Sequence, residues 1–226
     1  MRSLLQRYEK KYLLNKSQYQ LFLSFIRQYV DEDIHHVNHE PYFVETTYFD
    51  DDVNKLVRHS LSSPAYKEKL RLRTYNQTMS FLELKKKYLG QSYKLRIELN
   101  DVQKKQLLHD DLSFFDDSMK HKELFNMFIK YKLKPVVDVS YYRYAFEDAS
   151  IGLRITLDND ISYLYRDSEK ERLFENAYIL EIKCHQAFPV WLSKYLSEHR
   201  LHHQSLSKYG LSYLEHLKGP QYVIND

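Results

Sequence analysis

Hydrophobic and polar residues alternate with a period of two along most of this chain. That pattern is typical of β-strands that bury one face. Short connections such as 76–78 and 89–90 separate several of these segments and favour antiparallel hairpins. The expected strands are 6–14, 42–49, 67–75, 80–87, 91–99, 135–146, 152–158, 161–166 and 176–185.

Five shorter stretches have helical periodicity instead. Ser17 and Gln20 have the spacing of a capping box at the start of the first stretch, Asn100 can cap the second, and Pro189 suits the first turn of the fourth. The expected helices are 15–30, 100–109, 121–132, a helix that follows Pro189, and 209–217. Eight or nine antiparallel strands with a few helices predict an α+β fold.

The polar positions of these strands are occupied mainly by Lys and Arg. In 67–75, Lys69, Arg71 and Arg73 share one face, while Leu70 and Leu72 take the other. The same alternation gives charged faces to other strands. Their charged residues are Glu9, Lys11, Glu83, Lys85, Lys87, Lys94, Arg96, Glu98, Arg154, Asp158, Glu181 and Lys183.

Two arrangements are compatible with such strands. For any single strand, the simpler one is a half-exposed sheet whose charges face water. The whole set of strands favours a second arrangement, in which the charged faces point inward. One reason is that Lys and Arg are concentrated on these faces, with only single, spaced carboxylates. The other is that the amphipathic helices need an apolar sheet surface to cover. We therefore expect a closed antiparallel β-barrel of eight or nine strands, with helices packed on the outside and a cation-lined lumen.

Such a lumen repels itself when it is empty. Two unit charges about 6 Å apart at an effective dielectric constant of ~20 repel each other by roughly 3 kcal/mol. A polyanion would relieve this repulsion, and Arg and Lys side chains suit phosphate oxygens. A carboxylate among them either balances charge or holds Mg²⁺ or Mn²⁺ against phosphate. Glu181 and Glu9 are the first candidates for a metal ligand, followed by Glu98 and Glu83.

Composition narrows the function. The 226 residues suit a single domain over 1–226 and carry a net charge of only +3, which does not indicate a nucleic-acid binder. Four scattered glycines exclude a glycine-rich phosphate loop, and one cysteine excludes a disulfide framework and favours a cytoplasmic location. No apolar run has the ~18 residues of a membrane span, and the start of the chain has no secretory signal.

Several motifs, in this order, resemble the vacuolar transporter chaperone (VTC) domain, a polyphosphate polymerase domain among the CYTH-like triphosphate tunnel metalloenzymes. The similarity covers nearly the whole chain. The motifs are Tyr8-Glu9-Lys10-Lys11-Tyr12, Thr47-Tyr48-Phe49-Asp50, Lys69-Leu70-Arg71-Leu72-Arg73-Thr74-Tyr75, Leu82-Glu83-Leu84-Lys85, Tyr93-Lys94-Leu95-Arg96, Lys134-Pro135-Val136-Val137 with Tyr141 and Arg143, Leu153-Arg154-Ile155-Thr156-Leu157-Asp158, Leu180-Glu181-Ile182-Lys183 and Ser207-Lys208-Tyr209.

This resemblance implies a triphosphate tunnel in which the ATP γ-phosphoryl group is transferred to a growing polyphosphate chain with a divalent metal, Mn²⁺ or Mg²⁺. It implies that Glu181 is a metal ligand and that Ser207 precedes the last helix as a phosphate contact. The strand faces and motifs add Lys69, Lys87, Arg96 and Arg143 as further phosphate-binding residues. The phosphate ligands implied by the resemblance itself are Lys11, Arg71, Arg73, Lys85, Lys94, Arg154, Lys183 and Lys208.

The chain departs from the family pattern at two positions, where Asp138 and Ser205 stand in place of basic residues. Two alternatives to the polymerase therefore stay open: a metal-dependent triphosphatase, in which water is the nucleophile, and a non-catalytic polyphosphate-binding module. The expected partners are ATP, triphosphate and polyphosphate, together with a possible membrane protein that receives the product; nucleic acid is not among them.

Overall fold

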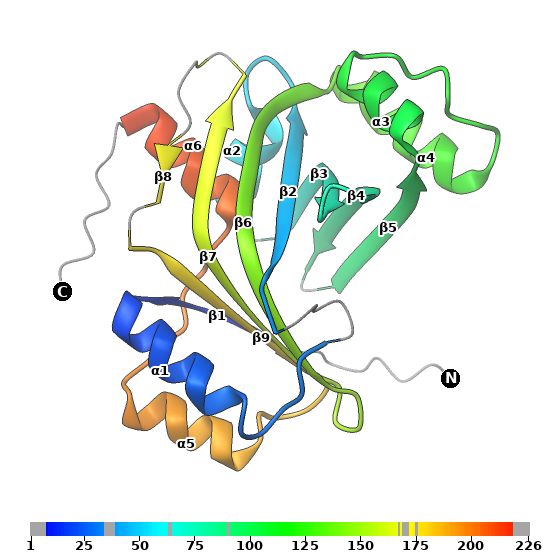
Figure 1. Cartoon of the computed structure of the whole chain (residues 1–226). Helices are drawn as coiled ribbons and strands as arrows, with labels where there is room; N and C mark the ends of the chain where they lie inside the picture. Colours follow the sequence, from blue (N-terminus) through cyan, green and yellow to red (C-terminus); the bar gives the residue numbers. More distant parts are fainter. Residues whose placement is uncertain are drawn as a thin grey trace.

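The central feature is one strongly curled antiparallel sheet (Figure 1). The structure is a computed structural model that describes residues 8–33, 39–62, 65–89, 91–166, 168, 172–174 and 176–218. The strand order is β1-β9-β7-β6-β2-β3-β4-β5, and β8 pairs with β7 beside this path. The strands are β1 (Tyr8–Leu14), β2 (Tyr42–Asp50), β3 (Tyr66–Tyr75), β4 (Met79–Tyr88), β5 (Gln91–Leu99), β6 (Lys134–Asp148), β7 (Leu153–Tyr165), β8 (Arg172–Leu173) and β9 (Tyr178–Cys184).

The sheet forms a half-barrel. Among the strands that the structure describes, no ladder joins β1 to β5, which are the two ends of the sheet. The α+β class and the large antiparallel sheet are confirmed, whereas the expected closure into a full barrel is wrong. Alternation along a strand reports which face is buried, but it carries no information on whether the two end strands pair.

Aliphatic side chains form the convex face of the half-barrel, and four helices cover it (Figure 1). Helices α1 (Lys16–Ile26) and α5 (Val190–Glu198) pack on β1, β9 and β7 through Phe22 and Leu192. Helices α3 (Asp101–Leu108) and α4 (Met119–Tyr131) pack on β3, β4 and β5 through Leu107 and Phe128. The charged positions of the same strands therefore face the concave side, as the alternation predicts.

The two remaining helices, α2 (Lys55–Ser62) and α6 (Lys208–Lys218), lie on the concave side. Tyr209 of α6 stacks on Tyr48 of β2, with ring centroids 4.5 Å apart. Tyr48 is the register partner of Arg71, so it belongs to the charged face of the sheet. An apolar cluster of this face, which includes Val57 of α2 and Tyr213 of α6, thus holds the two helices over part of the concavity.

Most expected elements exist, with changes at their ends. The first helix is capped by Asn15 in a capping box with Gln18, so the proposed box of Ser17 and Gln20 is wrong. The segments 152–158 and 161–166 form one continuous strand, β7. Neither α2 nor β8 was expected. Residues 6 and 7 of the first expected strand lie outside the described residues.

Among the described residues, none of the helices has the length and apolar character needed to cross a bilayer.

Candidate phosphate-binding cavity

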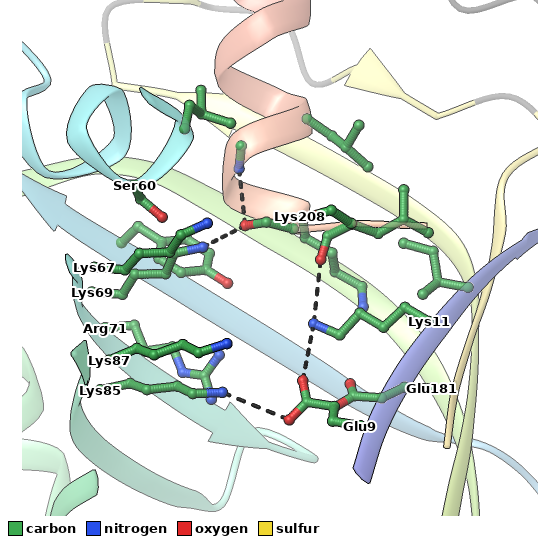
Figure 2. A pocket seen from close by; sticks show the side chains of 18 of the residues that line it. Glu9, Lys11, Ser60, Lys67, Lys69, Arg71, Lys85, Lys87, Glu181 and Lys208 are labelled. Carbon is green, nitrogen blue, oxygen red and sulfur yellow. Dashed lines mark hydrogen bonds and ion pairs between the residues drawn. The ribbon is translucent and has the colours of Figure 1, made fainter. Parts of the chain in front are cut away.

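A cavity of about 370 Å³ lies on the concave side, between β1, β3, β4, β9 and the start of α6 (Figure 2). We call it the basic cavity, because ten Lys and Arg side chains line it against two carboxylates. Such an excess of positive charge in a partly enclosed space suits a polyanion. The charged lining residues are Lys11, Lys67, Lys69, Arg71, Arg73, Lys85, Lys87, Arg143, Lys183, Lys208, Glu9 and Glu181.

The strand register explains why these cations meet. Lys67 of β3 lies opposite Lys87 of β4, and Lys69 lies opposite Lys85. Directly opposed side chains on adjacent strands are about 5 Å apart at Cβ, and like charges in this position destabilise the sheet. The arrangement costs stability in the empty protein, and an anion bound between the two rows would relieve that cost.

Glu83 is the counter-ion of the cavity floor. Its carboxylate accepts from Arg71 Nε at 2.9 Å, and its other oxygen lies 2.6 Å from Lys94 Nζ. Burial raises the pKa of Glu83, but Arg71, Arg73 and Lys94 outweigh burial and hold that pKa well below its usual range. Glu83 is therefore ionised, but it does not line the cavity, which argues against its candidacy as a metal ligand.

Asp158 is a second buried counter-ion, at another wall of the cavity. It is fully buried, it accepts from Arg143 Nε and Nη2 at 2.6 and 2.8 Å, and it also pairs with Lys208. Burial alone raises the pKa of Asp158, but Arg143 and Lys208 lower it below its usual value. A bidentate Arg–carboxylate pair is geometrically rigid, so Asp158 fixes the positions of both cations.

Glu181 and Glu9 are the two carboxylates that reach the basic cavity (Figure 2). They come from neighbouring strands, where Lys11 lies opposite Glu181 and Lys183 lies opposite Glu9. Glu9 is 3.4 Å from Lys11 and 3.9 Å from Lys85, and Glu181 pairs with Lys183. Burial raises the pKa of Glu181, but Lys183, Lys11 and Arg143 hold it well below its usual range.

These two carboxylates fit a divalent metal that is shared with phosphate. Mg²⁺ and Mn²⁺ take oxygen ligands, and Mg²⁺ is commonly held by one or two carboxylates while substrate phosphates complete its coordination. Glu181 is ionised and faces the cavity, as such a ligand must. The described residues contain no cluster of three or more metal-binding side chains. Phosphate oxygens could supply the remaining ligands of a metal held by these carboxylates.

Lys69 is the cation most affected by its surroundings. Burial, together with the charges of Lys11 and Arg71, lowers the pKa of Lys69 to about 7. Its Nζ lies 2.6 Å from Ser207 Oγ, which also accepts from the Gly210 backbone N–H at 3.2 Å. Without a bound anion, Lys69 is thus partly neutral near neutral pH.

One buried hydroxyl group in the lining, that of Tyr141, has no hydrogen-bond partner among the described residues. The Tyr141 side chain is 1% exposed, and its hydroxyl makes no hydrogen bond with any described residue. Lys208 Nζ lies 4.3 Å from the centre of its ring. An unsatisfied buried hydroxyl costs about 1–3 kcal/mol. An anionic oxygen in the cavity would accept from it and remove that cost.

The cavity does not take in every residue that the sequence indicated. Lys94 and Arg96 lie on the edge strand β5 around Glu83, outside the lining, and Glu98 lies exposed further along that strand. Arg154 is 3.0 Å from Asp33 and 3.6 Å from Glu147, away from the cavity. The other residues expected to bind phosphate, including Ser207, line it, as do the metal-ligand candidates Glu9 and Glu181.

Some lining residues were not expected. Lys67 continues the alternation of Lys69 and Arg71, so the pattern contained the signal that could have found it. Tyr48 gave no separate signal, because only the register with Arg71 places it in the lining. Ser60 gave none either, because it lies on the unpredicted helix α2.

The two departures from the family pattern differ in position. Asp138 accepts from Thr47 Oγ1 at 2.5 Å and pairs with Arg166 at 2.8 Å. Its neighbours Val137 and Val139 join the apolar cluster of the concave side, so Asp138 points to the opposite face, where it does not repel phosphate in the cavity. Ser205 does line the cavity.

The VTC domain family model matches residues 6–215 of this sequence. The chain belongs to the VTC domain family. The resemblance seen in the motifs, which run from Tyr8 to Tyr209, is thereby confirmed over their whole span. No curated protein matches the chain by sequence.

Several solved structures share the overall fold of this VTC domain. A candidate adenylate cyclase from Bacillus halodurans aligns with a TM-score of 0.57 and 15% identity, over 89% of this chain and 95% of that one. A Pyrococcus horikoshii protein aligns with a TM-score of 0.53 and 14% identity, over 92% and 99%. A candidate adenylate cyclase from Vibrio parahaemolyticus aligns with a TM-score of 0.52 and 16% identity, over 91% and 97%.

Proposed function

We propose that this VTC domain is a polyphosphate polymerase that transfers the γ-phosphoryl group of ATP to a growing polyphosphate chain. The observation that supports this most is the basic cavity, where ten cations face two carboxylates. Phosphoryl transfer depends on positioning and on neutralising charge more than on covalent chemistry. A rigid set of Arg and Lys side chains supplies both.

In this mechanism, Arg73 holds phosphate oxygens with its planar fork, and the lysines act as point charges. Arg71 and Arg143, whose forks are engaged by Glu83 and Asp158, offer phosphate only their remaining N–H groups. The terminal phosphate of the acceptor chain is already ionised, so attack in line with the leaving group needs no strong base. Glu181, with Glu9 beside it, would hold a divalent metal, which when bound supplies further neutralisation of charge on the phosphate oxygens. Tyr141 donates its free hydroxyl to a phosphate oxygen.

The test is incubation of the purified protein with ATP and Mn²⁺, followed by gel sizing of any polyphosphate. We expect Glu181→Gln and Arg71→Ala to lower the rate of chain growth by about 100-fold or more, as loss of an electrostatic contact to a developing charge does. Lys120→Gln, an exposed change on α4, is the control and should leave the rate unchanged. Full activity in both cavity variants would refute the mechanism.

The second candidate is hydrolysis in the same cavity. Lys85, on the cavity floor, keeps 45% of its side chain exposed, so water reaches the region where phosphate would bind. The same assay separates the two activities, because a triphosphatase releases free phosphate without chain growth. A module that only binds polyphosphate would give neither product, although triphosphate would still stabilise it.

A further inference from the structure

Among the described residues, two arginines near one end of the basic cavity are paired with carboxylates, whereas two lysines at the other end are not. At the β7 end, Arg143 is neutralised by Asp158 and Arg154 by Asp33, and both of these carboxylates are buried. Anions that extend past this end would meet Arg143 and Arg154, whose charges already have carboxylate partners. The pairing therefore opposes the passage of a long polyanion in this direction.

At the opposite end of the basic cavity, two lysines have no carboxylate partner among the described residues. Lys67 and Lys87 face each other across β3 and β4, and neither lies within salt-bridge distance of a carboxylate among the described residues. Figure 2 shows both side chains extending into the cavity, with Ser60 of α2 beside Lys67. This end leads directly to α2.

The basic surface continues along α2. Lys55, Arg58 and His59 are exposed, and the spacing i, i+3, i+4 places them on one face of the helix. With Leu61 and Tyr213 they line a second hollow of about 640 Å³, which we call the α2 groove. Leu61 also lines the basic cavity, so the two hollows adjoin.

The cations of the α2 groove have no counter-ions within the described chain. Lys55 lies over the Tyr131 ring at 5.7 Å, and Arg58 donates to the Val53 carbonyl oxygen at 3.4 Å. The acidic residues at the start of α2 are engaged with its backbone: Asp51 accepts from the Lys55 N–H at 2.8 Å, and Asp50 from the next two. The side-chain charges of Lys55 and Arg58 are left to bind a ligand.

We propose that the α2 groove binds the distal part of a polyphosphate chain whose end lies in the basic cavity. This inference rests on the proposed function and gives it a direction: the chain leaves past Lys67 and along α2, not past Arg143. A linear polyphosphate carries a negative charge on every unit. Each unpaired cation beyond the cavity therefore adds a favourable electrostatic interaction with the chain. Triphosphate is confined to the basic cavity and does not use the groove.

The test measures the affinities of tripolyphosphate and of a long-chain polyphosphate by calorimetry at two salt concentrations. In the double variant Lys55→Gln/Arg58→Gln, we expect the long chain to bind about tenfold more weakly. For the long chain, the slope of log affinity against log salt concentration should become shallower by about 1 to 2 in this variant. Each lost contact between a cation and a phosphate contributes somewhat less than one to that slope. Tripolyphosphate affinity should be unchanged, which also shows that the variant is folded.

The matched control is Lys105→Gln/Lys120→Gln, which removes the same charge from exposed positions on α3 and α4. Equal long-chain affinity in the wild type and the groove variant would overturn the inference, as would equal losses in the groove and control variants. A groove that binds a single-stranded oligonucleotide in place of long polyphosphate would overturn it too. Wild-type protein that fails to bind even tripolyphosphate refutes the proposed function itself, which is a different result.

Discussion

At the scale of single residues, the Lys and Arg side chains that line the basic cavity repel one another and shift one another's pKa values. Lys69 shows this most clearly, because burial and the adjacent cations lower its pKa to about 7. An anion reverses the effect of the cations and raises that pKa again. Ligand binding and proton binding are therefore linked at this side chain.

The first prediction concerns that linkage. At pH 8 the free protein carries mostly neutral Lys69, so triphosphate binding should be accompanied by proton uptake, whereas at pH 6 Lys69 is already protonated and this uptake should vanish. Calorimetry in buffers of different ionisation enthalpy measures the protons taken up. Lys69→Arg keeps the charge but stays protonated throughout, so uptake at pH 8 should be smaller in this variant. Equal uptake in both proteins would contradict the assignment.

The second prediction concerns Asp158, the buried partner of Arg143 and Lys208. Asp158→Asn leaves two cations without their counter-ion, and we expect the free energy of unfolding to fall by about 3–5 kcal/mol. Triphosphate should recover part of that loss, because its charge replaces the missing carboxylate. Denaturant unfolding with and without triphosphate measures both effects. Asp160→Asn, two positions along β7 and exposed, should change the stability little.

At the scale of elements, one buried carboxylate joins three of them. Asp50 ends β2, accepts from the Leu56 and Val57 N–H groups of α2 at 2.8 and 2.9 Å, and accepts from the Tyr209 hydroxyl of α6 at 2.7 Å. Ser207 and Lys208 directly precede or begin the helix that Tyr209 anchors. The position of these phosphate-binding candidates thus depends on a contact outside the cavity.

A third prediction follows for Tyr209→Phe. Loss of the hydroxyl leaves Asp50 one partner short, so the free energy of unfolding should fall by about 1–3 kcal/mol. Triphosphate should also bind more weakly, because Ser207 and Lys208 are no longer held in place. Tyr142→Phe, on the exposed part of β6, is the control. Unchanged triphosphate affinity in Tyr209→Phe would show that α6 is positioned by packing alone.

The sequence predicts elements well where a regular pattern is long. The alternation of Lys69, Arg71 and Arg73 with leucines correctly predicts both the strand and its charged face. Helix α2 has only two buried apolar side chains, Leu56 and Val57, which is too short a signal to distinguish it from a loop. Lys94 and Arg96 have the right alternation but lie on the edge strand, and alternation does not report how deep a face lies.

At the scale of the whole molecule, the empty protein keeps like charges together and should be stabilised by whatever neutralises them. The fourth prediction is that triphosphate, at about 100 times its dissociation constant, raises the free energy of unfolding by about 2.7 kcal/mol. Thermal unfolding at low salt measures the shift. Sulfate at the same ionic strength should give a much smaller shift, and an equal shift would mean that the stabilisation is only general screening.

The half-barrel also affects the route by which a polyphosphate ligand can reach the basic cavity. A closed barrel admits a linear polymer only through its ends, whereas a half-barrel is also open between its two end strands wherever α2 and α6 do not cover the concave side. Because β1 and β5 do not pair within the described chain, the lysines of the floor are reached sideways. We therefore expect cyclic metaphosphates, and linear polyphosphates with both termini blocked, to bind to this half-barrel, whereas a closed tunnel would exclude them.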